Sequence, residues 1–271
     1  PTGIGMQSAL FRFLKNDFRT SLWFHQISFG NSFDTLILCR NINYIPKDYI
    51  IPTDTDYFHC TSNNTIYGTQ MKTFPKTQVP LVCDMSSDIL SRTLDFSQFD
   101  LIYAGAQKNM GPAGVTLVVV KEEILGKVAR QIPSMMNYQV HIEKDSMFNT
   151  PSVFAVYTSL LNLQWLKKLG GIAGIENKNT KKAALLYDEI DRNPLFKGFA
   201  EKEDRSIMNP TFNLAEGADK TTFDKLWKEA NINGINGHRS VGGYRASMYN
   251  AMPIESVQVL VDVMQHFEKI S

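Results

Sequence analysis

Two polar clusters stand at the ends of neighbouring apolar runs, and each contains one group that could do chemistry. The run Val79–Cys83 leads into the acid Asp84, and the run Leu101–Ala104 leads towards the amine of Lys108. Short apolar runs that end in polar residues are typical of buried strands that leave a sheet. A lysine that carries an aldehyde as a Schiff base, beside an acid that keeps a pyridine nitrogen protonated, is the pair that a pyridoxal phosphate (PLP) enzyme needs.

Each member of this pair also has a simpler interpretation. Most lysines are solvated, so Lys108 alone could be a surface residue at a strand end. Asp84 alone could cap a helix together with Ser86 and Ser87. However, a carboxylate that ends a buried strand costs stability unless a cation pairs with it, and a protonated pyridine ring is such a cation. The two residues together therefore favour a cofactor site.

Composition excludes several other classes of protein. The chain has 271 residues, 43% of them hydrophobic and 20% charged, which is a globular balance and not that of a disordered chain. Lys and Arg total 28 against 27 Asp and Glu, and this near-neutral charge argues against nucleic-acid or anionic-membrane binding. No apolar run approaches the roughly 18 residues that span a bilayer. The first residues lack the basic start and apolar region of a signal peptide, so we expect a cytoplasmic protein.

The cysteines and most histidines offer no further site. Single cysteines without CxxC spacing predict reduced core residues, with neither a disulfide framework nor a zinc site, at Cys39, Cys60 and Cys83. Four histidines stand without a pattern of partners and are interpreted as structural or exposed: His25, His59, His141 and His266. We therefore expect no bound metal.

The order of the predicted elements indicates an α/β protein with two domains. A helix is expected over 7–14, and strands are expected over 57–61, 79–83, 101–104 and 115–120, the last as a strand buried on both faces. Helices over 151–169 and 172–192 should meet at Gly170-Gly171. A strand (208–214), a helix (222–230), short strands near Ile235 and Arg245, and a last helix should follow, the last with one apolar face formed by Val257, Leu260, Met264 and Phe267.

This alternation predicts how the chain divides. A large PLP-binding domain over residues 1–170 should have a mostly parallel sheet flanked by helices. A smaller α+β domain should follow over residues 171–271.

Five strings of the chain resemble one enzyme family. They are Asn64–Gly68 (NTIYG), Asp84–Ser87 (DMSS), Ala104–Gly114 (AGAQKNMGPAG), Ser146–Pro151 (SMFNTP) and Gly237–Ser247 (GHRSVGGYRAS). In order and spacing they resemble the phosphoserine aminotransferase family, a fold type I, class V aminotransferase family, over residues 44 to 271. Over residues 1 to 43 only the glycine-containing start and Trp23 align, with a shortened interval.

The resemblance implies a role for each residue of a PLP site. Lys108 would carry the cofactor and move the proton between the substrate α-carbon and the cofactor. Asp84 would pair with the ring nitrogen, and Thr65 would hydrogen-bond the phenolate side of the ring. The remaining cofactor contacts would come from Ser86 and Gln107, which would hold the phosphate, and from Trp23, which would stack on the ring. Aromatic stacking suits a flat, electron-poor ring, but core packing would explain Trp23 equally well.

The resemblance also implies a homodimer. Asn149 and Thr150 would reach the cofactor phosphate of the neighbouring subunit, so that the dimer would be needed for function. Taken alone, these two residues could instead form a helix N-cap before Pro151.

Three cations near the C-terminus form the expected substrate site. Phosphoserine and its keto acid carry a phosphate and a carboxylate at opposite ends, and planar guanidinium groups bind both. By resemblance Arg245 would take the α-carboxylate, while His238 and Arg239 would bind the substrate phosphate. The alternative is three cations in a solvated loop.

Two departures from the family leave the activity open. The family's N-terminal segment has an Asn-Ala-Gly-Pro start and a Ser-His-Arg motif that reaches the neighbouring substrate site, and this chain shows neither. We therefore expect much of that segment to be truncated or not represented here. The expected reaction converts O-phosphoserine and 2-oxoglutarate to 3-phosphohydroxypyruvate and glutamate by a ping-pong mechanism. The alternatives are a catalytically deficient PLP-binding form, or a class V aminotransferase for a non-phosphorylated amino acid; use of 4-phosphohydroxythreonine also stays open.

Overall fold

The computed structural model describes residues 10–11, 27–29, 43–239 and 241–271 of the chain. Trp23, His25 and Cys39 lie outside these residues, as does the predicted helix over 7–14 apart from its residues 10 and 11. Those two residues form a strand instead, so the helix prediction is wrong for them. No described helix is long and apolar enough to cross a membrane.

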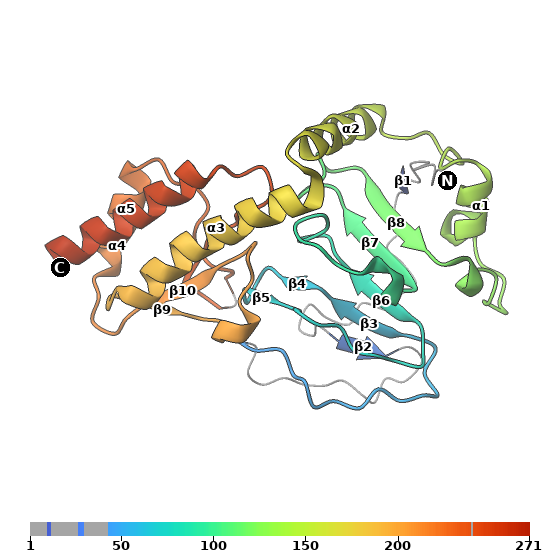
Figure 1. The fold of residues 1–271 in the computed structure, drawn as a ribbon, viewed down its shortest axis with the longest axis horizontal. Helices are drawn as coiled ribbons and strands as arrows, with labels where there is room; N and C mark the ends of the chain where they lie inside the picture. Colours follow the sequence, from blue (N-terminus) through green and yellow to red (C-terminus); the bar gives the residue numbers. More distant parts are fainter. Residues whose placement is uncertain (1–9, 12–26, 30–42, 240) are drawn as a thin grey trace.

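A six-stranded sheet organises the first part of the chain (Figure 1). Its strands, in order across the sheet, are β1 (Leu10–Phe11), β8 (Thr116–Val120), β7 (Leu101–Gly105), β6 (Leu81–Asp84), β3 (Phe58–Thr61) and β2 (Ile27–Phe29). The central strands β3, β6 and β7 are parallel, whereas β8 is antiparallel to β7 and β2 is antiparallel to β3. Because β1 is antiparallel to β8, four of these six described strands share one direction. The predicted α/β class is confirmed, with a mixed sheet.

The central strands separate an apolar face from a polar one. Alternate residues of β3, β6 and β7 point to one buried apolar cluster, which we call the first core. These residues are at most 2% exposed: Phe58, Cys60, Leu81, Cys83, Ile102 and Ala104. The intervening residues are half-buried on the opposite face and include Asp84. One prediction about the sheet is wrong, because Val119 of β8 is 51% exposed and this strand is therefore not buried on both faces.

Three helices begin and end close to the predicted positions: α2 (Val153–Lys168), α3 (Gly171–Arg192) and α4 (Lys220–Glu229). The predicted last helix is α5 (Ile254–Ile270), whereas α1 (Tyr138–Glu143) lies where no helix was predicted. Gly170 adopts a left-handed φ of +91° between α2 and α3, a conformation that glycine permits and that lets the chain turn directly into α3. Short 3-10 turns lie at Phe96–Gln98, Glu122–Ile124, Ser134–Met136 and Lys202–Asp204.

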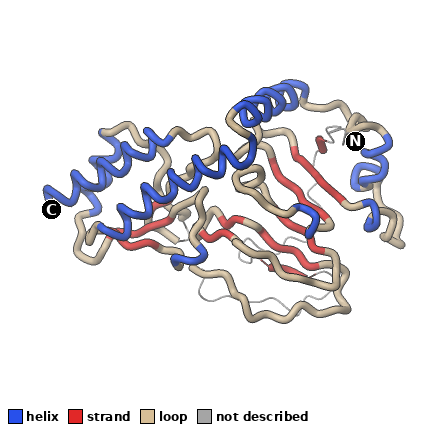
Figure 2. Tube along the Cα trace, viewed as in Figure 1, coloured by secondary structure: helices blue, strands red, loops and turns tan. Residues whose placement is uncertain are grey.

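A second core lies under α3 and α5, which run side by side over a small antiparallel sheet (Figures 1 and 2). That sheet has the order β11 (Tyr244–Arg245), β10 (Thr211–Leu214), β9 (Phe196–Gly198). The predicted apolar face of the last helix is confirmed, because all four of its residues are at most 4% exposed. The predicted strand near Ile235 is reduced to a single bridge between Asn236 and Tyr244. The two cores support a two-domain division, and we propose that the boundary lies near residue 170.

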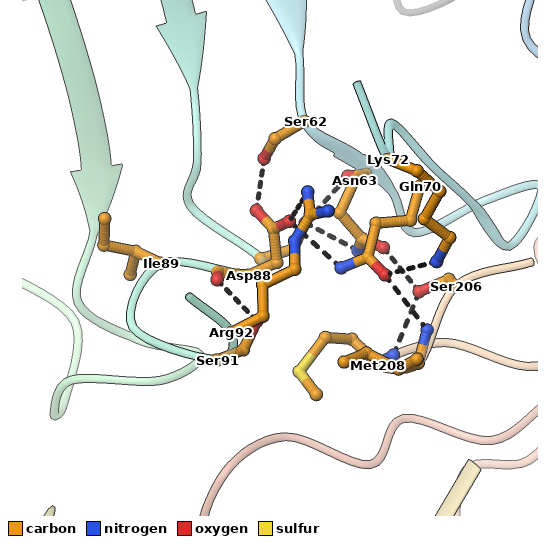
Figure 3. A network of polar contacts seen from close by, with 12 residues as sticks. Ser62, Asn63, Gln70, Lys72, Asp88, Ile89, Ser91, Arg92, Ser206 and Met208 are labelled. Carbon is orange, nitrogen blue, oxygen red and sulfur yellow. Dashed lines mark hydrogen bonds and ion pairs between the residues drawn. The ribbon is translucent and has the colours of Figure 1, made fainter. Parts of the chain in front are cut away.

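Buried polar groups join the two cores (Figure 3). The antiparallel pair of β4 (Asn63–Asn64) and β5 (Thr69–Gln70) connects the first part of the chain with the segment before β10, because β5 forms a β-bridge with that segment. The Asn63 amide donates to Ser87 and to Asn209, both at 2.9 Å, and Ser206 donates to Asn63. Thr211 donates to the Tyr67 carbonyl at 2.8 Å. We call the residues Asn63, Tyr67, Ser206, Asn209 and Thr211 the polar seam.

Candidate active site

The predicted acid and amine, Asp84 and Lys108, lie at one edge of the large sheet. Asp84 is the last residue of β6, and Lys108 lies in the turn after β7. These strands are parallel neighbours, with Asp84 opposite Tyr103, so their polar ends meet at the same edge. The fold thus brings the predicted pair to one edge, where the negative charge of Asp84 raises the pKa of Lys108 against the effect of burial.

The environment of Lys108 lowers the pKa of its side-chain amine. Burial lowers the pKa of Lys108, and the nearby positive charge of Arg245 lowers it further, whereas Asp84 and Asp88 oppose the shift. Within the described residues, no hydrogen-bond acceptor holds the half-buried ammonium group. A lysine with a lowered pKa is a better nucleophile and base near neutral pH than a solvated one.

Asn109 fixes the turn that carries Lys108, a role that no pattern in the sequence indicates. Its side-chain amide donates to the Ile89 carbonyl at 3.2 Å, and its oxygen accepts from the Asn250 N–H at 3.1 Å. Asn162 of α2 donates to the Asn109 carbonyl at 2.9 Å. The residue after the lysine is therefore tied to the loop after β6, to α2 and to the C-terminal part of the chain.

The two predicted phosphate ligands lie on either side of Gly105. The Ser86 hydroxyl accepts a hydrogen bond from the Gly105 N–H at 3.1 Å. A Cβ at Gly105 would lie 2.6 Å from the Gln107 side-chain oxygen, so the Gln107 amide covers this glycine. The absent side chain lets the Ser86 hydroxyl and the Gln107 amide lie close to the same backbone, and a hydroxyl and an amide together suit an oxyanion.

Arg245 brings the C-terminal part of the chain to this edge. It ends β11, and its Nη1 donates to the Thr65 carbonyl at 2.9 Å. Its Nε is buried and has no hydrogen-bond partner among the described residues. A buried guanidinium nitrogen without a partner is costly, and an anion bound there would satisfy it. Arg245 thus contacts Thr65, and its positive charge acts on Lys108.

His238 and Arg239 lie in the loop that leads into β11. The His238 carbonyl accepts from the Val241 and Gly242 N–H groups at 2.9 and 2.8 Å, which closes a tight turn. His238 is half-buried and Arg239 is exposed. Their contact with a substrate phosphate stays a prediction.

Asn149 and Thr150 lie in the loop between α1 and α2. Asn149 donates to the Thr150 carbonyl at 3.4 Å, and Thr150 is exposed. The residue at the N-cap of α2 is Ser152, so the alternative of a helix cap at these two positions is wrong. Their reach into a partner subunit stays a prediction.

The other predicted structural residues are mostly as expected. Cys60 and Cys83 are buried free thiols. His141 is buried with Nε2 3.0 Å from the Met135 carbonyl oxygen, and His266 is exposed. No group of metal-ligating side chains occurs in the part of the chain that the structure describes.

His59 is an exception, because it has a specific partner. Its Nε2 lies 3.0 Å from the hydroxyl oxygen of Tyr103, beside Asp84. The signal was present in the sequence, since both residues occupy polar-face positions of otherwise apolar strands.

The set as a whole can hold a small phosphorylated aldehyde. Lys108 offers an amine, Asp84 an acid, and Ser86 with Gln107 an oxyanion site, while Arg245 keeps one unpaired donor for a second anion. These chemical requirements match the residues present, and they come from three separate segments of the chain.

Comparisons with known proteins agree with this chemistry. The family model "Aminotransferase class-V" matches residues 41–260. The phosphoserine aminotransferase of Flavobacterium johnsoniae is 72% identical over 228 residues, which are 84% of this chain and 64% of that relative. A solved structure described as PLP-bound phosphoserine aminotransferase from Trichomonas vaginalis is 34% identical with a TM-score of 0.78, over 83% of this chain and 65% of that one.

A second solved phosphoserine aminotransferase, studied for radiation damage of its Schiff base, is 47% identical with a TM-score of 0.81. It matches over 84% of this chain and 65% of its own. The chain spans about 64% of the length of the curated relatives that it matches. Because the family match extends over most of the chain and includes the lysine turn, the chain belongs to the class-V aminotransferase family.

Proposed function

We propose that the chain forms part of a phosphoserine aminotransferase that uses PLP. The reaction interconverts O-phospho-L-serine and 2-oxoglutarate with 3-phosphohydroxypyruvate and glutamate. The observation that carries the proposal is the half-buried Lys108, with a lowered pKa, between the opposite charges of Asp84 and Arg245. The names of the relatives support the choice of substrate.

The cofactor would occupy the edge of the sheet between β6 and the turn after β7. Asp84 would meet the ring nitrogen, Thr65 the phenolate side, and Ser86 with Gln107 the phosphate. When bound, PLP supplies an electron sink that stabilises the charge left on the α-carbon. The assignment of the phosphate rests on the hydroxyl and amide that flank Gly105.

Lys108 would move the substrate's α-proton. Proton transfer is efficient when the pKa of the base lies near the operating pH, and burial shifts the pKa of Lys108 in that direction. Asn109 holds the turn through bonds to three other segments, so the Nζ would return to the same position in each half-reaction. The amino group would be transferred in two such half-reactions, the first with the amino donor and the second with the keto acid.

Arg245 would bind the substrate carboxylate. Its Nη1 is taken by the Thr65 carbonyl, which leaves Nε and Nη2 for a bidentate pair with a carboxylate. His238 and Arg239, in the loop before β11, would bind the substrate phosphate. The two anionic ends of phosphoserine would then be held by adjacent parts of one segment.

The dimer would complete the site. The loop between α1 and α2 places Asn149 and Thr150 at a half-buried and an exposed position. We propose a homodimer in which these two residues bind the cofactor phosphate of the neighbouring subunit.

An absorbance scan with PLP and phosphoserine tests the function. We expect the chain to develop a visible band with PLP, and we expect this band to shift when phosphoserine is added. Lys108→Ala should abolish both the band and the turnover. Lys121→Ala is the matched control, because Lys121 pairs with Asp100 at 3.1 Å near the far end of β8. An unchanged band and turnover in Lys108→Ala would refute the proposal.

The same preparation distinguishes the alternatives. A PLP-binding form without activity would keep the band and show no transamination. An enzyme for a non-phosphorylated amino acid would turn over alanine at least as fast as phosphoserine, and Arg239→Ala would not change that ratio.

A further inference from the structure

Three polar side chains lie on one face of three adjacent strands at the candidate site. His59 belongs to β3, Asp84 to β6 and Tyr103 to β7. Asp84 is in register with Tyr103, and His59 is in register with Val82, two residues before Asp84. Residues in register on parallel strands, and residues two apart along one strand, share a face. All three side chains therefore lie opposite the apolar face of the first core.

These side chains form a connected series of contacts. The His59 Nε2 lies 3.0 Å from the Tyr103 hydroxyl oxygen, and the two rings are stacked with centroids 5.9 Å apart. The Tyr103 hydroxyl is hydrogen-bonded to the Asp84 carboxylate. Asp84 Oδ1 also accepts from the Ser86 N–H at 2.8 Å. The carboxylate is therefore held both by its own loop and by the neighbouring strand.

The charges fix the direction in which the protons are donated. Burial raises the pKa of Tyr103, and the charge of Asp84 and the hydrogen bond to it raise it further, so the phenol stays protonated and donates to the carboxylate. Burial lowers the pKa of His59, against the opposing effect of Asp84, so the imidazole is neutral at pH 7. Because the phenol proton is committed to Asp84, a neutral His59 meets the Tyr103 oxygen as a donor through Nε2–H.

We propose that His59 and Tyr103 are positioning residues, which hold the Asp84 carboxylate oriented towards a cationic ring nitrogen. A carboxylate offers about four acceptor positions. The Ser86 N–H and the Tyr103 hydroxyl use two of them, which leaves room for one charged N–H from a ligand. The role of the ligand rests on the proposed function, whereas the hydrogen-bonded series itself does not.

The first experiment uses the full chain without cofactor. The ¹⁵N NMR signals of the His59 imidazole report its tautomer and its titration. We expect an Nε2–H tautomer in the wild type and a mixture of tautomers in Tyr103→Phe, which lacks the acceptor oxygen. Asp84→Asn should lower the pKa of His59 further, because the charge that opposes the shift is removed.

Tyr49→Phe is the matched control for loss of a phenol. Tyr49 stacks on Phe58 at 5.8 Å in the first core, on the other face of the sheet from Asp84. The Tyr49→Phe change should therefore leave the ¹⁵N signals of the His59 imidazole unchanged. If Tyr103→Phe and Tyr49→Phe give the same His59 tautomer, the hydrogen-bonded series is refuted.

The second experiment adds PLP labelled with ¹⁵N in its ring. In the wild type the ring nitrogen signal should be that of a protonated pyridine. Tyr103→Phe should weaken PLP binding about tenfold, the effect of one lost hydrogen bond to a charged group, and should move the ring signal towards the neutral form. His59→Gln keeps an N–H donor and should retain affinity better than His59→Leu.

The outcomes separate this proposal from the proposed function. A wild-type chain that binds no PLP contradicts the proposed function, and the cofactor-free titration then decides whether the series exists. A wild-type chain that binds PLP with a protonated ring supports the function. If Tyr103→Phe then matches Tyr49→Phe in both affinity and ring signal, the positioning role is overturned.

Discussion

The buried ion pair between Asp88 and Arg92 gives a quantitative test of the structure beneath the site (Figure 3). The Asp88 side chain is fully buried and that of Arg92 is 8% exposed, with 3.1 Å between Oδ2 and Nη2. Asp88 also accepts from the Gln70 amide at 3.1 Å and from the Ser62 hydroxyl. We predict that Arg92→Leu destabilises the chain, because it leaves a buried carboxylate without its cation.

The expected cost follows from what remains around the carboxylate. Removing one partner of a buried ion pair costs about 3–5 kcal/mol. Since Gln70 and Ser62 still donate to Asp88, we expect the lower end, about 3 kcal/mol. The double change Asp88→Asn with Arg92→Leu removes the charge as well as the cation, and should recover about half of that loss.

Urea unfolding of the single and double variants measures these values. The control is Lys225→Ala, which removes an exposed pair with Glu229 at 3.8 Å and should change the free energy of unfolding by less than about 0.5 kcal/mol. A cost for Arg92→Leu as small as that of the control would refute the reasoning. So would a double variant that loses the full sum of the two single changes.

Two further predictions concern backbone geometry and pH. Gly243 has φ +62° and a Cβ there would lie 2.1 Å from the Asn213 side-chain oxygen, so Gly243→Ala should cost about 2 kcal/mol or more in thermal unfolding. Gly217→Ala, at φ +84° with nothing within 4 Å, should cost only the backbone strain of about 1 kcal/mol, and equal losses at both sites would contradict the predicted clash. Burial lowers the pKa of Lys182 to about 8, below its ordinary value of 10.5, so the unfolded chain binds more protons than the folded chain between these values. The contribution of Lys182 to stability should therefore rise with pH from about 8, by at most about 1.4 kcal/mol per pH unit. If the free energy of unfolding of a Lys182→Met variant in urea had the same pH slope as that of the wild type, this assignment would be contradicted.

Local sequence patterns predicted the elements and the edge of the sheet at which the chemistry lies. The 3-4-3 spacing of Val257, Leu260, Met264 and Phe267 identified the buried face of α5, because helical periodicity is a local property. The apolar runs before Asp84 and Lys108 likewise identified β6 and β7. Parallel pairing of these strands then brings their ends together.

The remaining features depend on contacts between distant parts of the chain. The hydrogen bonds of Asn109 reach Asn162 and Asn250, and nothing near residue 109 in the sequence indicates those partners. The helix predicted at Leu10-Phe11 is a strand because those residues pair with β8, more than a hundred positions away. Exposure of Val119 likewise depends on what covers the sheet, which an apolar run cannot show.

The partner of His59 is an intermediate case. Its position in an alternating strand places it on the polar face, but the identity of its neighbour depends on the register between strands. Thr65 is similar, since the resemblance implies a role for its side chain whereas the structure adds that its carbonyl receives Arg245.

The polar seam has a consequence for how the two halves of the chain can move. Apolar surfaces tolerate sliding, whereas hydrogen bonds are directional and weaken steeply with misalignment. The Asn63 amide donates both to Ser87, three residues after Asp84, and to Asn209, just before β10. If the part of the chain that contains one core moved by about an ångström relative to the other, these hydrogen bonds would be strained at the same time. The free-energy cost of such a displacement is therefore cooperative. The polar seam thus restricts the distance between the turn that carries Lys108 and Arg245 of β11 to a narrow range. Mutations in the seam should widen the range of this distance before they unfold either core.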